Sequence, residues 1–354
     1  MKVYNVIGIM SGTSLDGLDI CYCTFSISSH QQWHYEIKNA DTISFPPSIK
    51  TKLSQSITFN GLELALFHNE FGNYIGQAVN NFIIHHKLNK TNIDAIASHG
   101  HTVFHQPENK LTLQIGNGAN ISSITQLPVV CDFRTGDMSL GGQGAPLVPI
   151  GDQLLFSEYD HCLNLGGIAN ISFQTQHRIA FDICPVNIVL NKLANSIGHE
   201  FDNKGEMAKS GSINTSLLKK LNALDYYKTS YPKSLGIEWI EQTVFPILAS
   251  YNIAIEHKLN TFIEHISIQI ANHLTDGSTT LITGGGAYNS FLIERIKTNS
   301  NSKIILPEKH IIDFKEALIF AFLGVLRIRQ ETNVLTSVTG ASANNIGGCI
   351  YQSL

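Results

Sequence analysis

The chain carries the sequence MSGTSLDG at residues 10–17, between two short apolar runs, Val3–Met10 and Leu18–Phe25. Each run has the length and composition of a buried β-strand, and a glycine-rich segment of this length commonly joins neighbouring strands. We therefore predict a β-hairpin at the start of the chain, rather than a strand that leads into a helix. Because glycine has no side chain, this turn could also bring backbone N–H groups close to phosphate oxygens.

A second hairpin is predicted in the middle of the chain, where NLGGIAN at residues 164–170 joins strands at 160–165 and 168–173. Another strand follows at 178–183, and a helix follows from about 187 to 197. Both hairpins open a stretch in which strands alternate with helices, which is typical of α/β layers. The recurrence predicts a duplicated scaffold with a cleft between its halves.

A third glycine-rich segment, TGGG at residues 283–286, follows a predicted strand at 280–283 and precedes a helix that starts near Asn289. Such a junction can present backbone N–H groups to an adenosine or its phosphates. None of the three segments matches the phosphate-loop or dinucleotide-binding patterns. A tight turn is the simpler interpretation of each segment alone, whereas three such turns on one α/β chain point to nucleotide binding.

The remaining predicted elements complete the α/β pattern. Short strands are predicted at 93–98 and 129–133, and helices at 61–88, 239–273 and 315–329. The second of these helices contains Pro246, which should break or kink it near its start. A chain of 354 residues is long for a single core, so two domains are expected.

The composition is that of a well-buried globular protein. Hydrophobic residues make up 43% and charged residues 15% of the sequence, and the formal net charge is −4. Lys and Arg form no run, which argues against nucleic acid as a partner because phosphate neutralisation needs clustered cations. The N-terminal apolar run is too short for a signal sequence, and no apolar stretch is long enough to span a bilayer. We therefore expect a cytoplasmic protein without a membrane partner.

Two residues that follow predicted strands could take part in chemistry. Asp182 could act as a general base at a strand end, although its spacing alone favours a cap for the following helix. Arg134 could hold a carboxylate through two parallel hydrogen bonds. A surface salt bridge is an equally good interpretation of Arg134 from the sequence pattern.

Several residues also have the chemistry of metal ligands. Asp16 or Asp19 could hold Mg²⁺, usually through water. The histidines at His99, His101 and His105 invite a zinc interpretation, but no suitable carboxylate or cysteine lies near them in the sequence. A neutral, hydrogen-bonded pocket wall is therefore the favoured interpretation of these histidines, and no metal ligand is assigned beyond Asp16 as a candidate.

These motifs, in order along nearly the whole chain, resemble those of the anhydro-N-acetylmuramic acid kinases, a family of the actin/hexokinase/Hsp70-like ATPase superfamily. The similar segments are MSGTSLDGLD (10–19), SHGHTVFHQP (98–107), LQIGNGAN (113–120), DFR (132–134), GGQGAPLVP (141–149), NLGGIANI (164–171), FD (181–182), TGGGAYNS (283–290), EALIFA (316–321) and VTGA (338–341).

One short segment and two single residues depart from the family pattern. The family commonly has Thr-Gly-Pro-Gly-Asn after its Phe-Asp pair, whereas this chain has ICPVN at residues 183–187. His101 stands where Gln is common, and Asp152 stands where His is often found. These changes concern the fit of the sugar and the shape of the loop after Asp182 rather than the class of reaction.

The resemblance implies an α/β, two-domain actin-like (ribonuclease H-like) fold, with ATP and Mg²⁺ in the interdomain cleft. It places the first domain at residues 1–130 plus about 331–354 and the second at 131–330. It also implies a catalytic role for Asp182, in place of the helix cap. The ATP contacts that it implies are Gly12, Thr13, Ser14, Leu15, Asp16, Gly17, Asn164, Gly166, Gly167, Asn170, Gly284, Gly285, Gly286 and Asn289.

The resemblance further places a sugar substrate against His99, Thr102, Arg134 and Glu316. An acidic residue in the first turn of a helix is also favoured by the helix dipole, which is an alternative reason for Glu316. The implied reaction is the ATP-dependent opening and O6 phosphorylation of 1,6-anhydro-N-acetylmuramic acid in cell-wall recycling, by a homodimer.

Two other functions stay open at this point. One is a kinase for another anhydrosugar such as levoglucosan, which a panel of substrates would distinguish. The other is an actin- or Hsp70-like ATP-binding module that switches partners without making a sugar product. ATPase activity stimulated by a protein and by no sugar would support that module.

Overall fold

The computed structural model describes residues 2–12 and 15–353 of the chain. These residues form two compact units, one from Met1–Leu155 together with Phe314–Leu354, and the other from Phe156–Asp313. Thr13 and Ser14, which the sequence assigns to ATP binding, lie outside the described residues.

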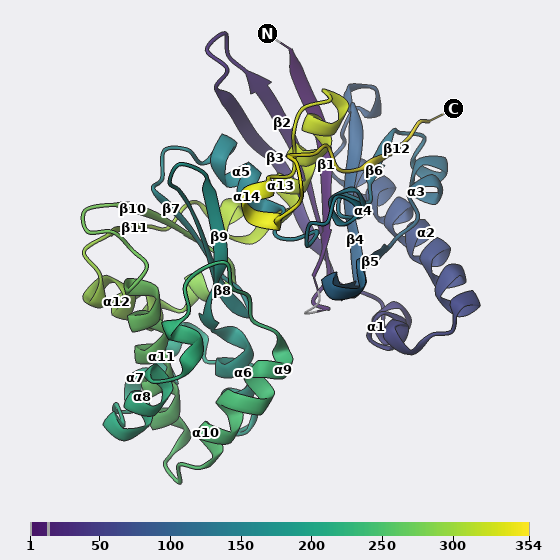
Figure 1. The fold of residues 1–354 in the computed structure, drawn as a ribbon. Coiled ribbons are helices and arrows are strands. Elements are labelled where there is room, and N and C mark those ends of the chain that lie inside the picture. Colours follow the sequence, from purple (N-terminus) through teal and green to yellow (C-terminus); the bar gives the residue numbers. More distant parts are fainter. Residues whose placement is uncertain (1, 13–14, 354) are drawn as a thin grey trace. The chain divides into compact units, whose positions relative to one another are not determined.

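The first unit is a mixed sheet with helices on both faces (Figure 1). Its strands are β1 (Val3–Ser11), β2 (Leu18–Ile27), β3 (Trp33–Ile43), β4 (Ala95–Gln106), β5 (Leu111–Ile115), β6 (Val129–Cys131) and β12 (Cys349–Tyr351). Its helices are α1 (Pro47–Gln55), α2 (Gly61–His85), α3 (Gly118–Thr125), α4 (Thr135–Ser139), α5 (Val148–Leu155), most of α13 (Lys309–Ile328) and α14 (Thr336–Thr339).

The predicted N-terminal hairpin is confirmed, because β1 and β2 pair antiparallel from Val3↔Ser26 to Ser11↔Leu18. The strands follow the order β3-β2-β1-β4-β6-β12, and both β4 and β6 run parallel to β1. The Ile7 and Ile9 side chains pack into the core under α2, so Gly8 between them faces the opposite side. A Cβ at Gly8 would lie 2.0 Å from the Ala317 carbonyl oxygen, so glycine is what lets α13 approach β1.

The second unit contains a smaller sheet and a helical layer around α11 (Figure 1). Its strands are β7 (His161–Leu165), β8 (Ile168–Gln174), β9 (Arg178–Pro185), β10 (Thr279–Thr283) and β11 (Lys303–Ile305). Its helices are α6 (Asn187–Asn195), α7 (Glu206–Ser210), α8 (Thr215–Asn222), α9 (Ile237–Trp239), a π-helical turn at Ile240–Val244, α10 (Phe245–Ala249), α11 (Ile255–Ala271) and α12 (Ser290–Asn299).

The two units share one strand order, which confirms the predicted duplication and the actin-like α/β fold. In the second sheet the order is β9-β8-β7-β10-β11, in which β7, β8 and β9 form an antiparallel meander and β10 and β11 run parallel to β7. The first sheet repeats this arrangement with β3-β2-β1-β4-β6. This order, three antiparallel strands followed by two parallel ones, is the ribonuclease H-like organisation.

The limits of the two units differ from those that the resemblance implies. Residues 131–155 and 314–330 belong to the first unit rather than to the second. The first stretch follows β6, which extends the first sheet, and Asp137 accepts a hydrogen bond from Thr339 near the C-terminus. The second stretch is α13, which packs on β1 through Gly8.

The single helix predicted at 239–273 is wrong. The chain instead forms the short elements α9, the π-helical turn and α10, and a separate helix, α11, starts at Ile255. Pro246, which has no backbone N–H, lies directly after the π-helical turn, where the Phe245 N–H bonds to the Ile240 carbonyl oxygen. The true break comes between Ala249 and Ile255, in a stretch whose apolar side chains hide it from a helical-periodicity count.

Candidate functional site

Four polar side chains form a row across the sheet of the second unit. Thr283 of β10 is in register with Asn164 of β7, Asn164 with Asn170 of β8, and Asn170 with Asp182 of β9. Residues in register across neighbouring strands point to the same face of a sheet. The structure therefore brings the predicted residues Asn164, Asn170 and Asp182 into one row with Thr283, the first residue of the TGGG segment.

Asp182 is held by hydrogen bonds from the segment at residues 226–235. Its Oδ2 accepts a hydrogen bond from the Leu235 backbone N–H at 2.9 Å, and its carbonyl oxygen accepts one from the Tyr226 hydroxyl at 2.6 Å. Within residues 2–12 and 15–353, Oδ1 of Asp182 has no hydrogen-bond partner. Burial raises the pKa of Asp182, and the hydrogen bond from Leu235 partly opposes that rise. One oxygen is thus fixed while the other can accept a proton.

A β-bulge sets the direction of the Asp182 side chain. The register of β8 and β9 shifts between Ala169↔Cys184 and Asn170↔Asp182, so Ile183 is an extra residue on β9. Bulges re-aim neighbouring side chains and are common beside active sites. The Ile183 side chain is fully buried, which anchors the bulge in the core of the second unit.

The two glycine-rich turns of the second unit pack directly against each other. A Cβ at Gly284 would lie 2.5 Å from Asn164 Oδ1, and one at Gly286 would lie 2.7 Å from the Leu165 Cβ. Gly284 also has a φ of +82°, which favours glycine. The Asn187 amide group completes this cluster with a hydrogen bond of 3.3 Å to the Leu165 carbonyl oxygen. Glycine is therefore required where the turn after β10 meets the turn after β7.

The other predicted ATP residues of this unit differ in their surroundings. Gly285 is exposed, and the nearest atom to a Cβ there would be 3.9 Å away, so its backbone borders open space. The Gly166 carbonyl oxygen accepts from the Asn187 N–H and the Gly167 carbonyl oxygen accepts from the Val186 N–H, which fixes the turn. Asn289 caps α12, because its Oδ1 accepts a hydrogen bond from the Leu292 N–H at 3.0 Å.

The glycine-rich turn of the first unit connects to the histidine-rich strand. The Leu15 N–H donates to the Gly12 carbonyl oxygen at 3.3 Å, and Leu15 has a φ of +58°. The hydroxyl of Ser11 and the Nδ1 of His101 are hydrogen-bonded at 3.0 Å, and both residues are buried. Burial lowers the pKa of His101 to about 4, so this imidazole is neutral. This agrees with the prediction from the sequence that His101 is a neutral, hydrogen-bonded residue rather than a zinc ligand.

The two carboxylates that could hold Mg²⁺ near this turn, those of Asp16 and Asp19, differ in exposure and in hydrogen bonding. Asp16 is exposed, whereas Asp19 Oδ1 accepts a hydrogen bond of 2.6 Å from the Thr42 hydroxyl. Gly17 is buried against β3, where a Cβ would lie 2.8 Å from the Ile43 carbonyl oxygen. Asp16 therefore offers an exposed hard-oxygen donor of the kind that Mg²⁺ prefers, whereas Asp19 already accepts a hydrogen bond.

Three of the four predicted sugar residues come together in the first unit. Arg134 donates to His99 Nε2 from both Nε, at 3.1 Å, and Nη2, at 2.9 Å. The Nδ1 of His99 bonds to the Gly100 carbonyl oxygen at 2.9 Å, so Nδ1 carries the proton and His99 is neutral. Burial and the Arg134 charge together hold the pKa of His99 well below its usual value.

Glu316 completes this cluster from the first unit's long helix α13. Its carboxylate reaches solvent, yet enough protein surrounds it to raise its pKa, against the lowering effect of Arg134 and Lys315. Phe320, one turn later, packs its ring 4.6 Å from that of His99. Burial lowers the pKa of Arg134 to about 10, with Glu316 opposing, so Arg134 remains charged at neutral pH. The cluster offers one cation, one anion and a neutral imidazole.

Thr102 lies farther along β4 and is not joined to this cluster by a hydrogen bond among the described residues. Its hydroxyl accepts from the Gln114 amide at 3.3 Å across the β4–β5 pair. His105, the third histidine, bonds to Thr112 at 3.3 Å.

Asp137 is a positioning residue that the sequence did not indicate. It is fully buried, and its carboxylate accepts hydrogen bonds from the Gly144 N–H at 2.8 Å, the Thr339 hydroxyl at 2.9 Å and the Asn345 amide at 2.8 Å. The carbonyl oxygen of the same Gly144 accepts a hydrogen bond of 2.7 Å from Arg134 Nη1. Asp137 thus ties the GGQGAP loop and the C-terminal VTGA segment to Arg134. In the sequence, the only sign of this role is that Asp137 is a charged residue in a short helix, α4.

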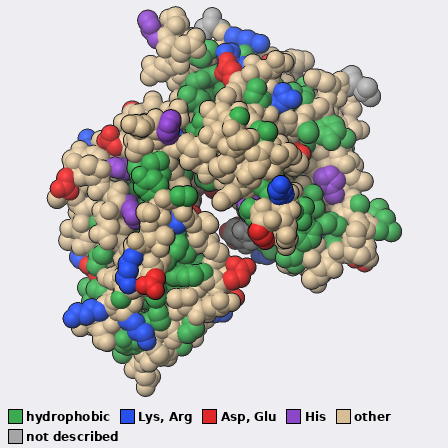
Figure 2. All heavy atoms as spheres, viewed as in Figure 1, with side chains coloured by type: hydrophobic (Ala, Val, Ile, Leu, Met, Phe, Trp, Pro, Cys, Tyr) green, Lys and Arg blue, Asp and Glu red, His purple; other side chains and the backbone are tan. Residues whose placement is uncertain are grey.

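None of the described helices is both long and apolar enough to cross a bilayer. On the face drawn in Figure 2, Lys and Arg side chains are dispersed and alternate with Asp and Glu.

Comparison with known proteins gives full-length matches. The family model described as "Anhydro-N-acetylmuramic acid kinase" matches residues 4–353. Proteins named anhydro-N-acetylmuramic acid kinase are similar to this chain, from Sulfurovum sp. (33% identity, 99% of this chain and 100% of the relative) and Shewanella putrefaciens (34%, 98% of each). One from Francisella tularensis subsp. novicida is 32% identical over 97% of each chain.

Proposed function

Because this chain belongs to the anhydro-N-acetylmuramic acid kinase family, we propose that it is an ATP-dependent kinase that opens 1,6-anhydro-N-acetylmuramic acid and phosphorylates it. The observation that carries the proposal is the row of Asn164, Asn170 and Asp182, which places a carboxylate with a free oxygen beside the glycine turn after β7. The product would be N-acetylmuramic acid 6-phosphate.

The reaction couples hydrolysis of an internal ether bridge to phosphoryl transfer. Water adds to the anomeric carbon, the bond from that carbon to the bridge oxygen breaks, and the released O6 takes the γ-phosphoryl group of ATP. ADP leaves, and the water's second proton passes to a base. No oxidant or further reactant is needed for this balance.

Asp182 is the base in this scheme. Oδ1 accepts the water's proton, while Oδ2 stays bonded to the Leu235 N–H and keeps the carboxylate oriented. Burial raises the pKa of Asp182, which makes it a stronger base than an ordinary aspartate.

ATP binding is assigned to the glycine-rich turns. The exposed Gly285 backbone and the packed Gly284 and Gly286 fit an adenosine, because larger residues would push the two turns apart. Backbone N–H groups of the Gly12–Gly17 turn fit phosphate oxygens. Mg²⁺, held through water by the exposed carboxylate of Asp16, would neutralise charge on the transferring phosphoryl group.

The sugar's lactyl carboxylate is assigned to Arg134. Its contacts with His99 and Gly144 leave N–H groups on both terminal nitrogens free to bind an anion. Glu316 and Thr102 fit sugar hydroxyl and amide groups. We also propose that the protein is a homodimer and that it is located in the cytoplasm, as the family resemblance implies.

We expect Arg134→Lys to raise the KM for the sugar about 10- to 100-fold while the KM for ATP changes little. A lysine lacks the planar guanidinium fork that bonds a carboxylate through two parallel N–H groups, and a hydrogen bond to a charged group contributes about 1.5–3 kcal/mol. Steady-state kinetics with each substrate varied in turn measures this. Arg327→Lys is the matched control, since Arg327 also bonds a glycine carbonyl oxygen, that of Gly348 at 2.7 Å. An unchanged KM for the sugar would remove Arg134 from the substrate site.

Labelled water tests the reaction itself. In ¹⁸O-water the product should carry the label at the anomeric hydroxyl and none in the phosphate ester, because the ester oxygen comes from the sugar's own bridge. Mass spectrometry of rapidly quenched product gives the positions, and a product-only control corrects for slow anomeric exchange. Label in the phosphate ester oxygen would mean that water attacks C6 instead of the anomeric carbon, and label in inorganic phosphate without phosphorylated sugar would mean that ATP is merely hydrolysed. The proposal allows neither result.

The names of the relatives do not favour the alternatives, and the same assay separates them. A preference for levoglucosan over 1,6-anhydro-N-acetylmuramic acid would identify a different anhydrosugar kinase. ATP turnover without any phosphorylated sugar would instead indicate an ATP-binding switch.

A further inference from the structure

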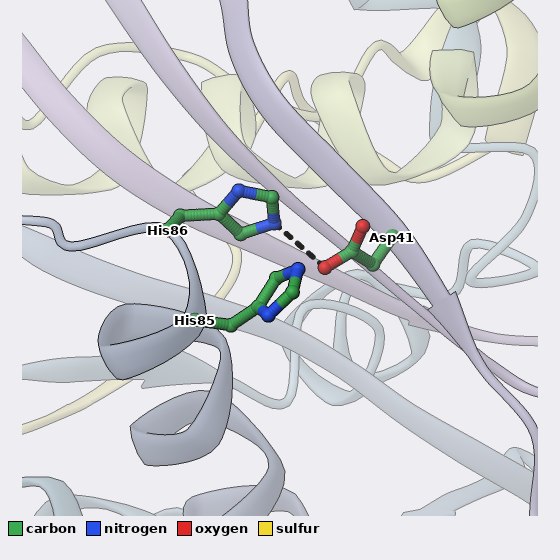
Figure 3. Close-up of side chains that lie close together, drawn as sticks. All are labelled: Asp41, His85 and His86. Atoms are coloured by element: carbon green, nitrogen blue, oxygen red, sulfur yellow. Dashed lines mark hydrogen bonds and ion pairs between the residues drawn. The ribbon is translucent and has the colours of Figure 1, made fainter.

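Two histidines and an aspartate meet at the edge of the first sheet, on residues to which the proposed kinase assigns no role. His85 is the last residue of α2, His86 is its C-cap, and Asp41 lies on the edge strand β3. One ligand atom of each side chain lies within 4.8 Å of the other two. Figure 3 shows both imidazole rings directed toward the Asp41 carboxylate.

The three side chains are already arranged by contacts. His86 Nε2 lies 2.7 Å from Asp41 Oδ2, and its ring is 4.6 Å from that of Phe82. The rings of His85 and His86 meet edge to face with their centroids 4.8 Å apart. His85 is exposed and His86 and Asp41 are half-buried, so an ion could enter from solvent.

We propose that Asp41, His85 and His86 bind a divalent transition-metal ion of the Zn²⁺ type, with water completing the coordination. Two imidazoles and one carboxylate are the ligands that Zn²⁺ accepts at about 2.0–2.2 Å in tetrahedral sites. Mg²⁺ and Ca²⁺ prefer oxygen ligands, so two imidazoles exclude them. This ion is therefore distinct from the Mg²⁺ that accompanies ATP.

Two further features favour a cation at this place. Asn39, two residues before Asp41 on the same strand face, lies 3.1 Å from His86 Nδ1 through its amide group. With its amide oxygen turned to Nδ1, Asn39 would accept a hydrogen bond from the Nδ1–H group and leave Nε2 free for the metal. Such a hydrogen-bond acceptor is the usual outer partner of a ligating histidine. The carboxyl end of α2 also carries partial negative charge that attracts cations.

The ion would link the edge strand β3 to the end of α2. β3 pairs with β2 alone in the described part of the chain, so its outer edge is held by side-chain contacts such as Asp41–His86. Metal binding would add bonds between residues that lie more than forty positions apart in the sequence, Asp41 on β3 and His85 at the end of α2. We infer a structural role that stabilises this edge of the sheet.

The test uses the full chain, freed of metal with a chelator and titrated with Zn²⁺ by calorimetry. We expect one Zn²⁺ per chain, and a loss of affinity of about 10-fold or more in His85→Gln and Asp41→Asn. His85→Gln is the sharper variant, because no hydrogen bond of the His85 side chain is present among the described residues. His34→Gln, an exposed histidine on the same strand, is the matched control and should bind as the unaltered chain does.

Two spectroscopic readouts accompany the titration. Co²⁺ in place of Zn²⁺ should give the intense visible absorption of a four-coordinate site, and His85→Gln should abolish it. Zn²⁺ should also raise the Tm of the unaltered chain and not that of His85→Gln. Absence of a one-to-one site, or equal binding by His85→Gln and the unaltered chain, would overturn the proposal and leave Asp41–His86 as a plain ion pair. Equal loss in His34→Gln would overturn it too.

Discussion

Asp182→Asn should fold normally and lose turnover by about 10²- to 10⁴-fold, the usual contribution of a positioned general base. The asparagine keeps the size of the side chain and can still accept the Leu235 N–H through its amide oxygen. Its amide nitrogen cannot take a proton from water, so the anomeric carbon is no longer attacked efficiently. Assays of kcat and KM with saturating ATP measure the change.

Two controls separate this effect from a change in structure. Asn170→Ala removes a side chain of the same row without removing a base, and should reduce kcat far less. Calorimetry should show ATP binding unchanged in Asp182→Asn. If Asp182→Asn retained more than about a tenth of the turnover, another group would have to be the base.

The pH profile gives an independent check on the same carboxylate. A base must be ionised to act, so activity should fall as the pH drops through the pKa of Asp182. Because burial raises that pKa, the acid limb of kcat/KM should lie above the value of about 3.9 for an ordinary aspartate. Asp182→Asn should lack this limb. An acid limb at or below the ordinary value would mean that the observed proton acceptor is a different group.

Local patterns in the sequence predicted the parts of the fold that rest on local rules. Both hairpins were predicted because a glycine-rich turn between two apolar runs has few alternatives. Strand β3 was missed, although Trp33, Tyr35 and Ile37 alternate with polar residues in the way of a half-buried strand. As an edge strand it buries little, so the apolar runs that mark central strands are absent from it.

The site could be predicted only as separate motifs. Asp182 was placed by its position at a strand end and by the family resemblance, but nothing in the sequence indicates that it shares a row with Asn164 and Asn170. Strand register and bulges such as the one at Ile183 arise from tertiary packing. Its partners Tyr226 and Leu235 lie in an irregular segment whose path depends on the whole second unit.

Asp152→Asn should destabilise the first unit by about 3–5 kcal/mol, because it leaves a buried ammonium group without its counter-ion. The Lys315 Nζ lies 2.6 Å from Asp152 Oδ1, and both side chains are buried, Asp152 on α5 and Lys315 on α13. Since each 1.4 kcal/mol is about a factor of ten in an equilibrium constant, the ratio of folded to unfolded protein would fall by more than about a hundredfold. Urea unfolding curves measure the loss as a lower midpoint.

An exposed ion pair of equal length provides the contrast. Lys52 and Glu70 also approach to 2.6 Å, but their side chains are 43% and 46% exposed, so Glu70→Gln should cost at most about 1 kcal/mol.

Replacing both buried partners, as Asp152→Leu with Lys315→Met, should recover most of the stability, because no buried charge then remains. Asp152→His, the residue that the family often has here, should behave as the single variant does, since a neutral imidazole cannot offset the Lys315 charge. Equal small losses in Asp152→Asn and Glu70→Gln would show that Lys315 finds water or another partner. In that case the buried ion pair would contribute little to the packing of α5 against α13, the helix that carries Glu316.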